Sequence, residues 1–91
     1  MNETNDAIEL KYPVTVKGMK YSFLTMRRPK VRDQLAAEKA GVTHAEREAT
    51  LFANLCDVVP DVIKELDMTD YGQLQECYEG FLVLRPVSLN S

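Results

Sequence analysis

The sequence has few of the residues on which metal sites and redox chemistry depend. It contains one histidine, two cysteines and no tryptophan. Cys56 and Cys77 form no CxxC pair and are far apart, so the spacing of a zinc site is absent. We expect two reduced thiols that pack as small hydrophobic side chains. His44 falls in the first turn of an expected helix, where we expect an exposed side chain without a metal or catalytic role.

Phosphate-binding loops are also missing, because the four glycines are scattered along the chain. Acidic residues are frequent between positions 57 and 79. Asp67 and Asp70, however, flank an expected helix start, where carboxylates interact favourably with the helix dipole. The pattern therefore predicts a protein that is not an enzyme and that has no cofactor and no metal site.

Long hydrophobic runs are absent as well. No apolar stretch approaches the roughly 18–20 residues that cross a bilayer. The first six residues are polar and acidic, unlike the start of a secretory signal peptide. We therefore expect a cytoplasmic protein with no membrane partner.

The overall composition is that of one small globular domain: 91 residues, 45% of them hydrophobic and 27% charged. We expect an ordered core over residues 8–85, with flexible ends at residues 1–6 and 87–91. The net charge of -3 is unevenly spread, with a balance of +3 over residues 1–40 and -6 over residues 41–91. Such polarity is common in partner-binding proteins, although short chains also show it by chance.

An N-terminal β-hairpin is predicted by two runs of alternating apolar and polar residues, 8–16 and 19–26. Gly18 tolerates the positive φ that a tight turn between them requires. A two-residue loop predicts three apolar pairs on one face: Val16 with Met19, Val14 with Tyr21, and Tyr12 with Phe23. We expect this face to be part of the core, with Leu24 and Met26 on the opposite face.

Three or four short helices are predicted after the hairpin. The first is expected from Pro29 to Ala40, where Gly41 would cap its C-terminus. Val31 and Leu35 would be the main packing residues of this helix.

The later helices have clearer start signals. Thr43 and Glu46 match a capping box, Pro60 suits a first helical turn, and Thr69 or Asp70 would cap the last helix. The packing residues recur at helical spacing: Ala45, Ala49, Phe52, Leu55 and Cys56, then Val62, Ile63 and Leu66, then Tyr71, Leu74, Tyr78 (or Cys77) and Phe81. The predicted architecture is a single α+β domain, in which the helices pack against each other and against one face of the hairpin.

Basic residues are concentrated between positions 17 and 32, and we call this group the basic patch: Lys17, Lys20, Arg27, Arg28, Lys30 and Arg32. Such a cluster is typical of nucleic-acid binding, although the chain as a whole is acidic. A second interpretation is a protein-binding surface in which Arg28 or Arg32 pairs with carboxylates. A third is purely structural, with Asp33 pairing locally with arginines at the start of a helix. The residues leave all three open.

Two segments carry a family resemblance by their order and spacing. The first is Arg-Arg-Pro at 27–29 with Asp33 four residues after the proline, and it follows the expected hairpin. The second, from Leu66 to Leu74, has the pattern Leu-Asp-x-x-Asp-Tyr-x-x-Leu. Together they resemble the tail assembly chaperone family of Mu-like bacteriophages (tail assembly protein E, or 41 or 14) over about residues 8–82.

The resemblance implies a non-enzymatic phage or prophage protein that is made late, in the cytoplasm of the bacterial host, and is absent from the mature virion. Its implied partner is the tail tape measure protein, which it would keep soluble until tail tube subunits polymerise around it. A frameshifted longer form of the chain, or the tail tube protein, is a further implied partner. Homo-oligomerisation is left open.

The positions that match the family motifs are Arg27, Arg28, Pro29, Asp33, Asp67, Asp70 and Tyr71. Whether they bind a partner or maintain the fold is left open by the match. Arg32 is a further candidate because it lies in the basic patch. Leu24 and Met26 are candidates for partner contact on the condition that their face of the hairpin is uncovered.

Two other functions compete with a chaperone. One is a small phage or bacterial regulator that binds nucleic acid through the basic patch at 17–32. The other is a structural tail component, which would be found in purified phage particles.

Overall fold

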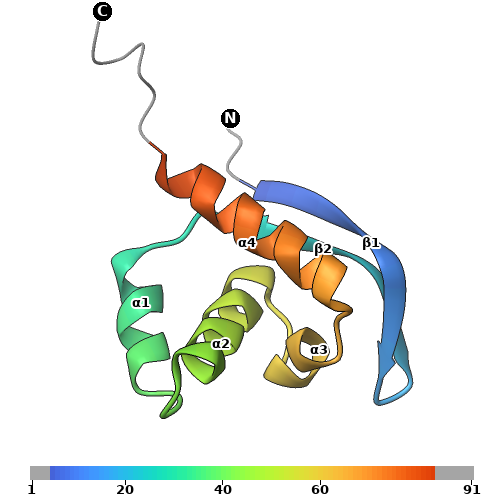
Figure 1. Ribbon diagram of the computed structural model, residues 1–91, viewed down its shortest axis with the longest axis horizontal. Coiled ribbons are helices and arrows are strands. Elements are labelled where there is room, and N and C mark those ends of the chain that lie inside the picture. The colour runs from blue at the N-terminus through green and yellow to red at the C-terminus, as the bar shows by residue number, and fades with distance from the viewer. Residues whose placement is uncertain (1–4, 84–91) are drawn as a thin grey trace, which may run out of the picture.

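Residues 5–83, the part of the chain that the computed structural model describes, form a β-hairpin followed by four helices (Figure 1). The hairpin consists of β1 (Asn5–Val16) and β2 (Met19–Arg27). The helices are α1 (Val31–Glu38), α2 (His44–Cys56), α3 (Pro60–Lys64) and α4 (Met68–Leu82). The predicted α+β class is therefore confirmed.

The first strand begins earlier than the predicted ordered core. Asn5 and Asp6 both pair with residues of β2, so they belong to the hairpin. Residues 1–4 and 84–91, which contain the remainder of the predicted flexible ends, lie outside the described part of the chain.

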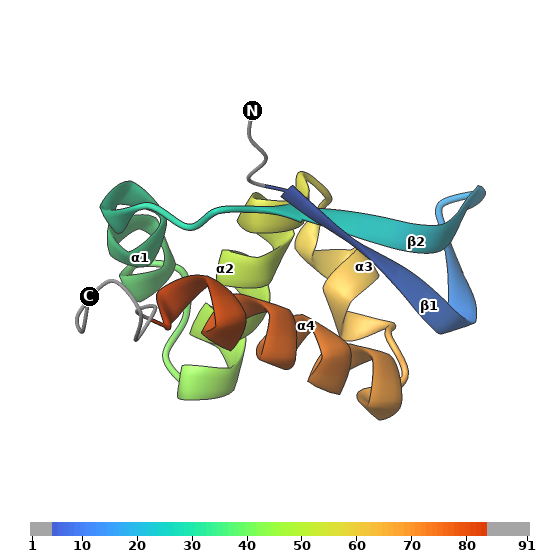
Figure 2. The same cartoon turned by 90° about the horizontal axis from the view of Figure 1, so that it is seen from above.

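Helix α2 is at the centre of the packing. It contacts α1, α3 and β2, while α4 packs against both strands of the hairpin. Figures 1 and 2 both place α1 at one end of the molecule and the hairpin turn at the other. The most deeply buried apolar side chains come from β2, α2, α3 and α4: Met26, Phe52, Leu55, Val62 and Leu74.

The packing residues predicted for the last three helices are largely confirmed. Those that are buried are Ala49, Phe52, Leu55, Cys56, Val62, Ile63, Leu66 and Leu74. Three more from α4, Tyr71, Tyr78 and Phe81, are partly buried against the same core. Ala45 is the exception, because it is exposed.

The hairpin follows the predicted pairing only near its turn. Lys17 and Gly18 have positive φ values of 52° and 81°, as a tight hairpin turn requires. The two pairs next to the turn are confirmed: Val16 with Met19, and Val14 with Tyr21. The third pair is wrong, because Phe23 lies opposite Glu9 and not opposite Tyr12.

An irregularity in β1 causes this difference. Residues 10–13 of β1 lie opposite a single residue of β2, Ser22, which is an offset of three. Because side chains alternate along a strand, an odd offset changes the side of β2 that faces the helices. Tyr21 packs against the core before the irregularity, and Leu24 and Met26 do so after it.

The offset reverses the predicted faces of β2 beyond the irregularity. Leu24 and Met26 are 3% and 0% exposed, so they are core residues. Tyr12 and Phe23, which were expected in the core, are 51% and 59% exposed. Leu24 and Met26 were candidates for partner contact only if their face of the hairpin was uncovered. That face is covered, so the condition is not met.

Asp70 of α4 holds the irregular segment in place. Its carboxylate accepts hydrogen bonds of 2.9 Å from the backbone N–H groups of Lys11 and Tyr12, and one of 2.9 Å from the Gln73 side chain. The Gln73 amide also donates to the carbonyl of Glu9 at 3.3 Å. Asp70 is fully buried. It thereby provides acceptors for backbone donors in a segment that interrupts the strand ladder.

Helix α1 turns a different face inward from the one predicted. Val31 and Leu35 were expected to pack, but they are 77% and 59% exposed. The buried residues are Asp33 and Ala37, which lie one turn apart on the same face. The burial of the Asp33 carboxylate decides the orientation, because its hydrogen bonds, described below, hold that face of the helix inward.

We expect Asp70→Asn to lower the free energy of unfolding by about 2–3 kcal/mol, because an amide would direct a donor at backbone N–H groups that the carboxylate now satisfies. Urea denaturation followed by circular dichroism measures this. Glu76→Gln, the same chemical change at an exposed position of α4, should stay within about 0.5 kcal/mol of the wild type. Equal stability of the two variants would contradict the role given to Asp70.

Met26→Ser should destabilise the domain by about 3–5 kcal/mol, because it removes a fully buried side chain and leaves a cavity with a polar group. Phe23→Ser, at an exposed position of the same strand, should cost far less. Thermal melts of the two variants check the face assignment, and a similar loss in both would contradict it.

Candidate functional site

Arg27 and Asp33 clamp the junction between β2 and α1. The Arg27 guanidinium donates two hydrogen bonds to the Asp33 carboxylate, at 2.9 and 2.7 Å, and the Lys30 N–H donates a third at 2.8 Å. Asp33 is 4% exposed. The hydrogen bonds from Arg27 hold the pKa of Asp33 below its usual range, and the same contact raises the pKa of Arg27. The predicted local pairing of Asp33 with an arginine is confirmed.

The second motif segment also makes contacts within the domain. Asp67, and not Thr69 or Asp70 as predicted, is the N-cap of α4, and its carboxylate accepts a 2.9 Å hydrogen bond from the Thr69 N–H. The Tyr71 hydroxyl donates to the carboxylate of Glu48 on α2. Burial, followed by that hydrogen bond, raises the pKa of Tyr71 above its usual value.

The motif positions therefore divide into two groups. Five of them have side chains engaged within the domain: Arg27, Asp33, Asp67, Asp70 and Tyr71. Arg28 and Pro29 remain at the surface, between the end of β2 and α1. Arg28 is exposed, and its guanidinium carbon lies 5.7 Å from the centre of the Phe81 ring on α4.

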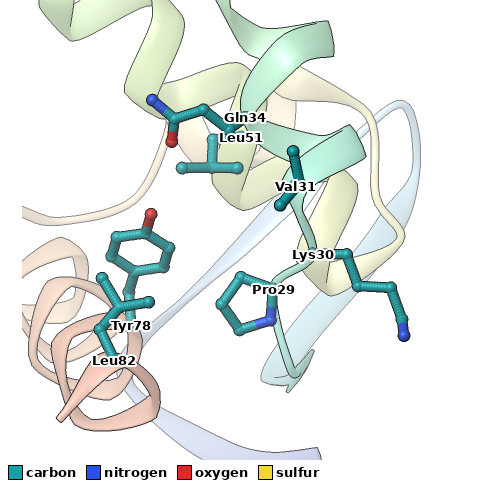
Figure 3. A pocket seen from close by; sticks show the side chains of 7 residues that line it. All are labelled: Pro29, Lys30, Val31, Gln34, Leu51, Tyr78 and Leu82. Carbon is teal, nitrogen blue, oxygen red and sulfur yellow. The ribbon is translucent and has the colours of Figure 1, made fainter.

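A groove opens beside this surface segment, between α1 and the C-terminal half of α4 (Figure 3). Its volume is about 300 Å3. Leu51 of α2 and Tyr78 of α4 line it, and Val31 and Leu82 belong to its two walls. Pro29, Lys30 and Gln34 complete the lining. Lys30 extends away from Tyr78 and Leu82, so its charge lies at the rim.

The groove is mainly apolar and accessible. Val31 and Leu82 are 77% and 56% exposed, and Leu35, one helical turn after Val31, is 59% exposed. Sequence periodicity assigned Val31 and Leu35 to the core and did not identify Leu82. No sequence signal predicted this exposure, because Val31 and Leu35 are the largest apolar residues of a short helix whose only others are Ala36 and Ala37.

A second hollow of about 130 Å3 continues from the groove toward the corner between α1 and α2. The two share Gln34, Leu51 and Tyr78, and the second adds Glu38, Glu48, His44 and Arg47 among its lining residues. The charged side chains here have partners within the domain. Arg47 lies 3.8 Å from Glu38, and the Glu48 carboxylate accepts hydrogen bonds from the Tyr71 hydroxyl and, at 3.1 Å, from the Gln75 amide.

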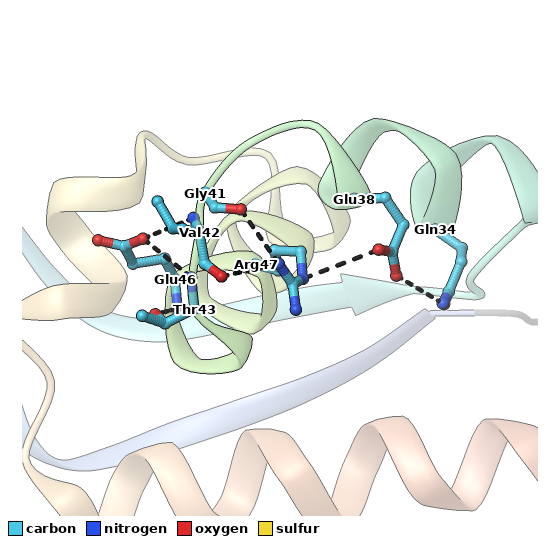
Figure 4. Close-up of polar contacts among 7 residues, drawn as sticks. All are labelled: Gln34, Glu38, Gly41, Val42, Thr43, Glu46 and Arg47. Carbon is cyan, nitrogen blue, oxygen red and sulfur yellow. Dashed lines mark hydrogen bonds and ion pairs between the residues drawn. The ribbon is translucent and has the colours of Figure 1, made fainter.

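The corner itself is held by the predicted capping box (Figure 4). The Glu46 N–H donates to Thr43 Oγ1 at 3.1 Å, and the Thr43 N–H donates to Glu46 Oε1 at 3.3 Å. Gly41 is not the C-cap of α1, which is Lys39. A Cβ at Gly41 would instead lie 2.6 Å from the Cβ of Glu46, so the close approach of the loop to α2 requires glycine here.

The basic patch does not form one surface. Lys17 and Lys20 lie at the hairpin turn, while Arg28 and Lys30 lie at the other end of β2, beside α1. A nine-residue strand separates the two groups by roughly 30 Å. Arg27 is paired with Asp33. Arg32 lies on the opposite face of α1 from the groove residue Gln34, because two residues correspond to about 200° of helix rotation.

The described residues carry little reactive chemistry. Cys56 and Cys77 are free thiols, and burial raises their pKa values to about 12 and about 11. Within residues 5–83, no group of three His, Cys, Asp or Glu side chains is arranged to hold a metal ion. No helix in the same range is long and apolar enough to span a bilayer.

The sequence was compared with protein families, curated proteins and solved structures. The profile of the phage tail assembly chaperone proteins, described as E, or 41 or 14, matches residues 7–83. The chain belongs to this family. No curated protein and no solved structure gives a match.

In this tail assembly chaperone, most of the motif residues support the architecture around the groove. Asp33 positions α1, which is one wall, and Asp67 caps α4, which is the other. Tyr71 ties α4 to α2 through Glu48. Arg28 and Pro29 are the motif residues that border the groove from the solvent side, so they are the motif positions most available to a partner.

We expect the chaperone to lose stability below about pH 4, because Asp33 and Asp70 have pKa values lowered from the ordinary 3.8. For Asp70 burial opposes ionisation, but the hydrogen bonds from Lys11, Tyr12 and Gln73 outweigh it. A lowered folded-state pKa stabilises the fold above the unfolded-state value, and this contribution disappears as the pH falls through the folded-state value.

Urea denaturation at about pH 6 and about pH 3 measures this loss. Asp33→Asn should be less stable than the wild type at the higher pH but should lose less between the two. An equally large loss in the variant would contradict the assignment to Asp33.

Proposed function

We propose that this chaperone binds the phage tail tape measure protein and keeps it soluble until tail tube subunits assemble around it. It would act in the cytoplasm of the bacterial host, late in infection, without enzymatic activity, and would be absent from the finished virion. A frameshifted longer form of the chain, or the tail tube protein, would bind the complex of chaperone and tape measure protein during assembly.

The observation that carries this proposal is the open apolar groove between α1 and α4. A protein that keeps a long helical client soluble needs exposed apolar surface for the client and charge around it for solubility. Val31 and Leu82 provide the apolar surface on opposite walls. Arg28 and Lys30 provide charge beside it.

The groove also offers residues that can be substituted without unfolding the domain, which the hairpin does not. Leu24 and Met26 are core residues, so their substitution would unfold the domain before it could report on a client. Val31 and Leu82 of the groove are exposed, and their substitution should leave the fold intact. Arg28 and Pro29 remain proposed contact residues. Arg32 also remains a proposed contact residue, but a partner would have to contact it on the other side of α1.

The direct test is co-expression of the chaperone with a candidate tape measure protein, followed by affinity purification and size-exclusion chromatography. We expect the tape measure protein to become soluble and to co-elute with the wild type. Val31→Ser combined with Leu82→Ser should weaken the complex by about tenfold or more, because two apolar contacts are lost.

A matched control is Val42→Ser combined with Val59→Ser. Both residues are exposed, at 86% and 49%, and neither lines the groove. This variant should bind like the wild type. A tape measure protein that stays insoluble and unbound with the wild-type chaperone would refute the proposed function.

A further inference from the structure

The groove has an electrostatic polarity along its length. At the Pro29 end are two cations: Lys30 lines the groove, and Arg28 lies over Phe81 near the end of α4. Among residues 5–83 the structure records no ion pair for either of them. The adjoining hollow at the other end contains two carboxylates, Glu38 and Glu48, and one cation, Arg47, which lies 3.8 Å from Glu38.

Asp33, which follows Lys30 by three residues, does not neutralise this charge. Asp33 is buried and already bound by Arg27 through two hydrogen bonds, so its charge is matched. Arg28 retains guanidinium N–H donors in its position over the aromatic ring, and Lys30 extends outward from the rim. The pair is therefore arranged to receive carboxylates from another molecule.

The apolar surface has the length and shape that suit a helix. Val31 and Leu35 lie one turn apart along α1, about 6 Å by helical rise, and both are more than half exposed. Val31 lines the groove on α1, Tyr78 and Leu82 line it on α4, and Leu51 of α2 completes its apolar lining. A helix that presents apolar residues at i and i+4 would pack between the two walls.

We propose that the groove between α1 and α4 binds an amphipathic helix of the client, and that acidic residues of that helix pair with Arg28 and Lys30 at the Pro29 end. At the opposite end Arg47 is already engaged by Glu38, so the acidic residues of the client helix would pair at the Pro29 end. This rests on the proposed function for the identity of the client, while the preference for acidic helices is a property of the groove itself.

The probe is a set of three synthetic helical peptides with one leucine stripe in common. The polar positions at one end of each peptide carry Glu, Gln or Lys, and the remaining polar positions are the same in all three. Titration into the 15N-labelled full chain at low salt should shift the backbone signals around Leu51 and Tyr78. We expect the Glu peptide to bind at least about tenfold more tightly than the Lys peptide, with a difference that shrinks as salt is added.

The decisive variants reverse charge at either end of β2. Arg28→Glu combined with Lys30→Glu should abolish or invert the preference for the Glu peptide. Lys17→Glu combined with Lys20→Glu makes the same change in net charge at the hairpin turn and should leave the preference intact. Thermal melts verify that both variants are folded.

Four results would overturn the proposal. Two are equal binding of the Glu and Lys peptides and equal effects of the two charge reversals; in either case, solubilisation of the tape measure protein in the same protein batch would leave the proposed function standing. Another is a change of the Leu51 and Tyr78 signals when the chain is shortened to end at Val83, which would make residues 84–91 the occupant. The last is a concentration-dependent shift of those signals without peptide, which would make a second copy the occupant.

Discussion

The hydrogen bonds of a single buried carboxylate connect the two halves of this fold. Asp70, on the first turn of α4, accepts from two backbone N–H groups in the irregular part of β1, 59 and 58 residues away in the sequence. That segment interrupts the strand ladder, and its donors would be costly to bury without a partner. Because Asp70 satisfies them, the odd offset between the strands is stable, and Leu24 and Met26 can enter the core.

A second carboxylate has the corresponding role at the other end of β2. Asp33 is held by Arg27 and by the Lys30 N–H, and this contact determines which face of α1 turns inward. The consequence is that Val31 and Leu35 point away from the core and contribute an exposed apolar row. The buried Asp33 carboxylate therefore determines that Val31 and Leu35 are exposed on the surface of α1.

The family motifs take on a physical meaning in this arrangement. Most of their charged and aromatic residues are bonded within the domain, so substitution at those positions would disturb the walls of the groove and any partner binding together. Arg28 and Pro29 differ, since they lie at the surface beside Phe81 and Val31. A mutational study of the family motifs needs stability measurements alongside binding, because the two groups of residues would otherwise give the same loss of binding for different reasons.

The local features of this protein follow from its sequence alone. The tight turn at Lys17–Gly18, the Thr43–Glu46 capping box, Pro60 at the start of α3 and the apolar stripes of α2 and α4 depend on neighbouring residues, and local patterns predict them. The family follows from its two motif segments. Only the tertiary structure decided which face of β2 is buried. It also decided that Asp70 binds the irregular segment of β1 and does not cap its own helix, and that a groove lies between α1 and α4. These features depend on contacts between residues far apart in the chain, which strand and helix periodicity cannot register.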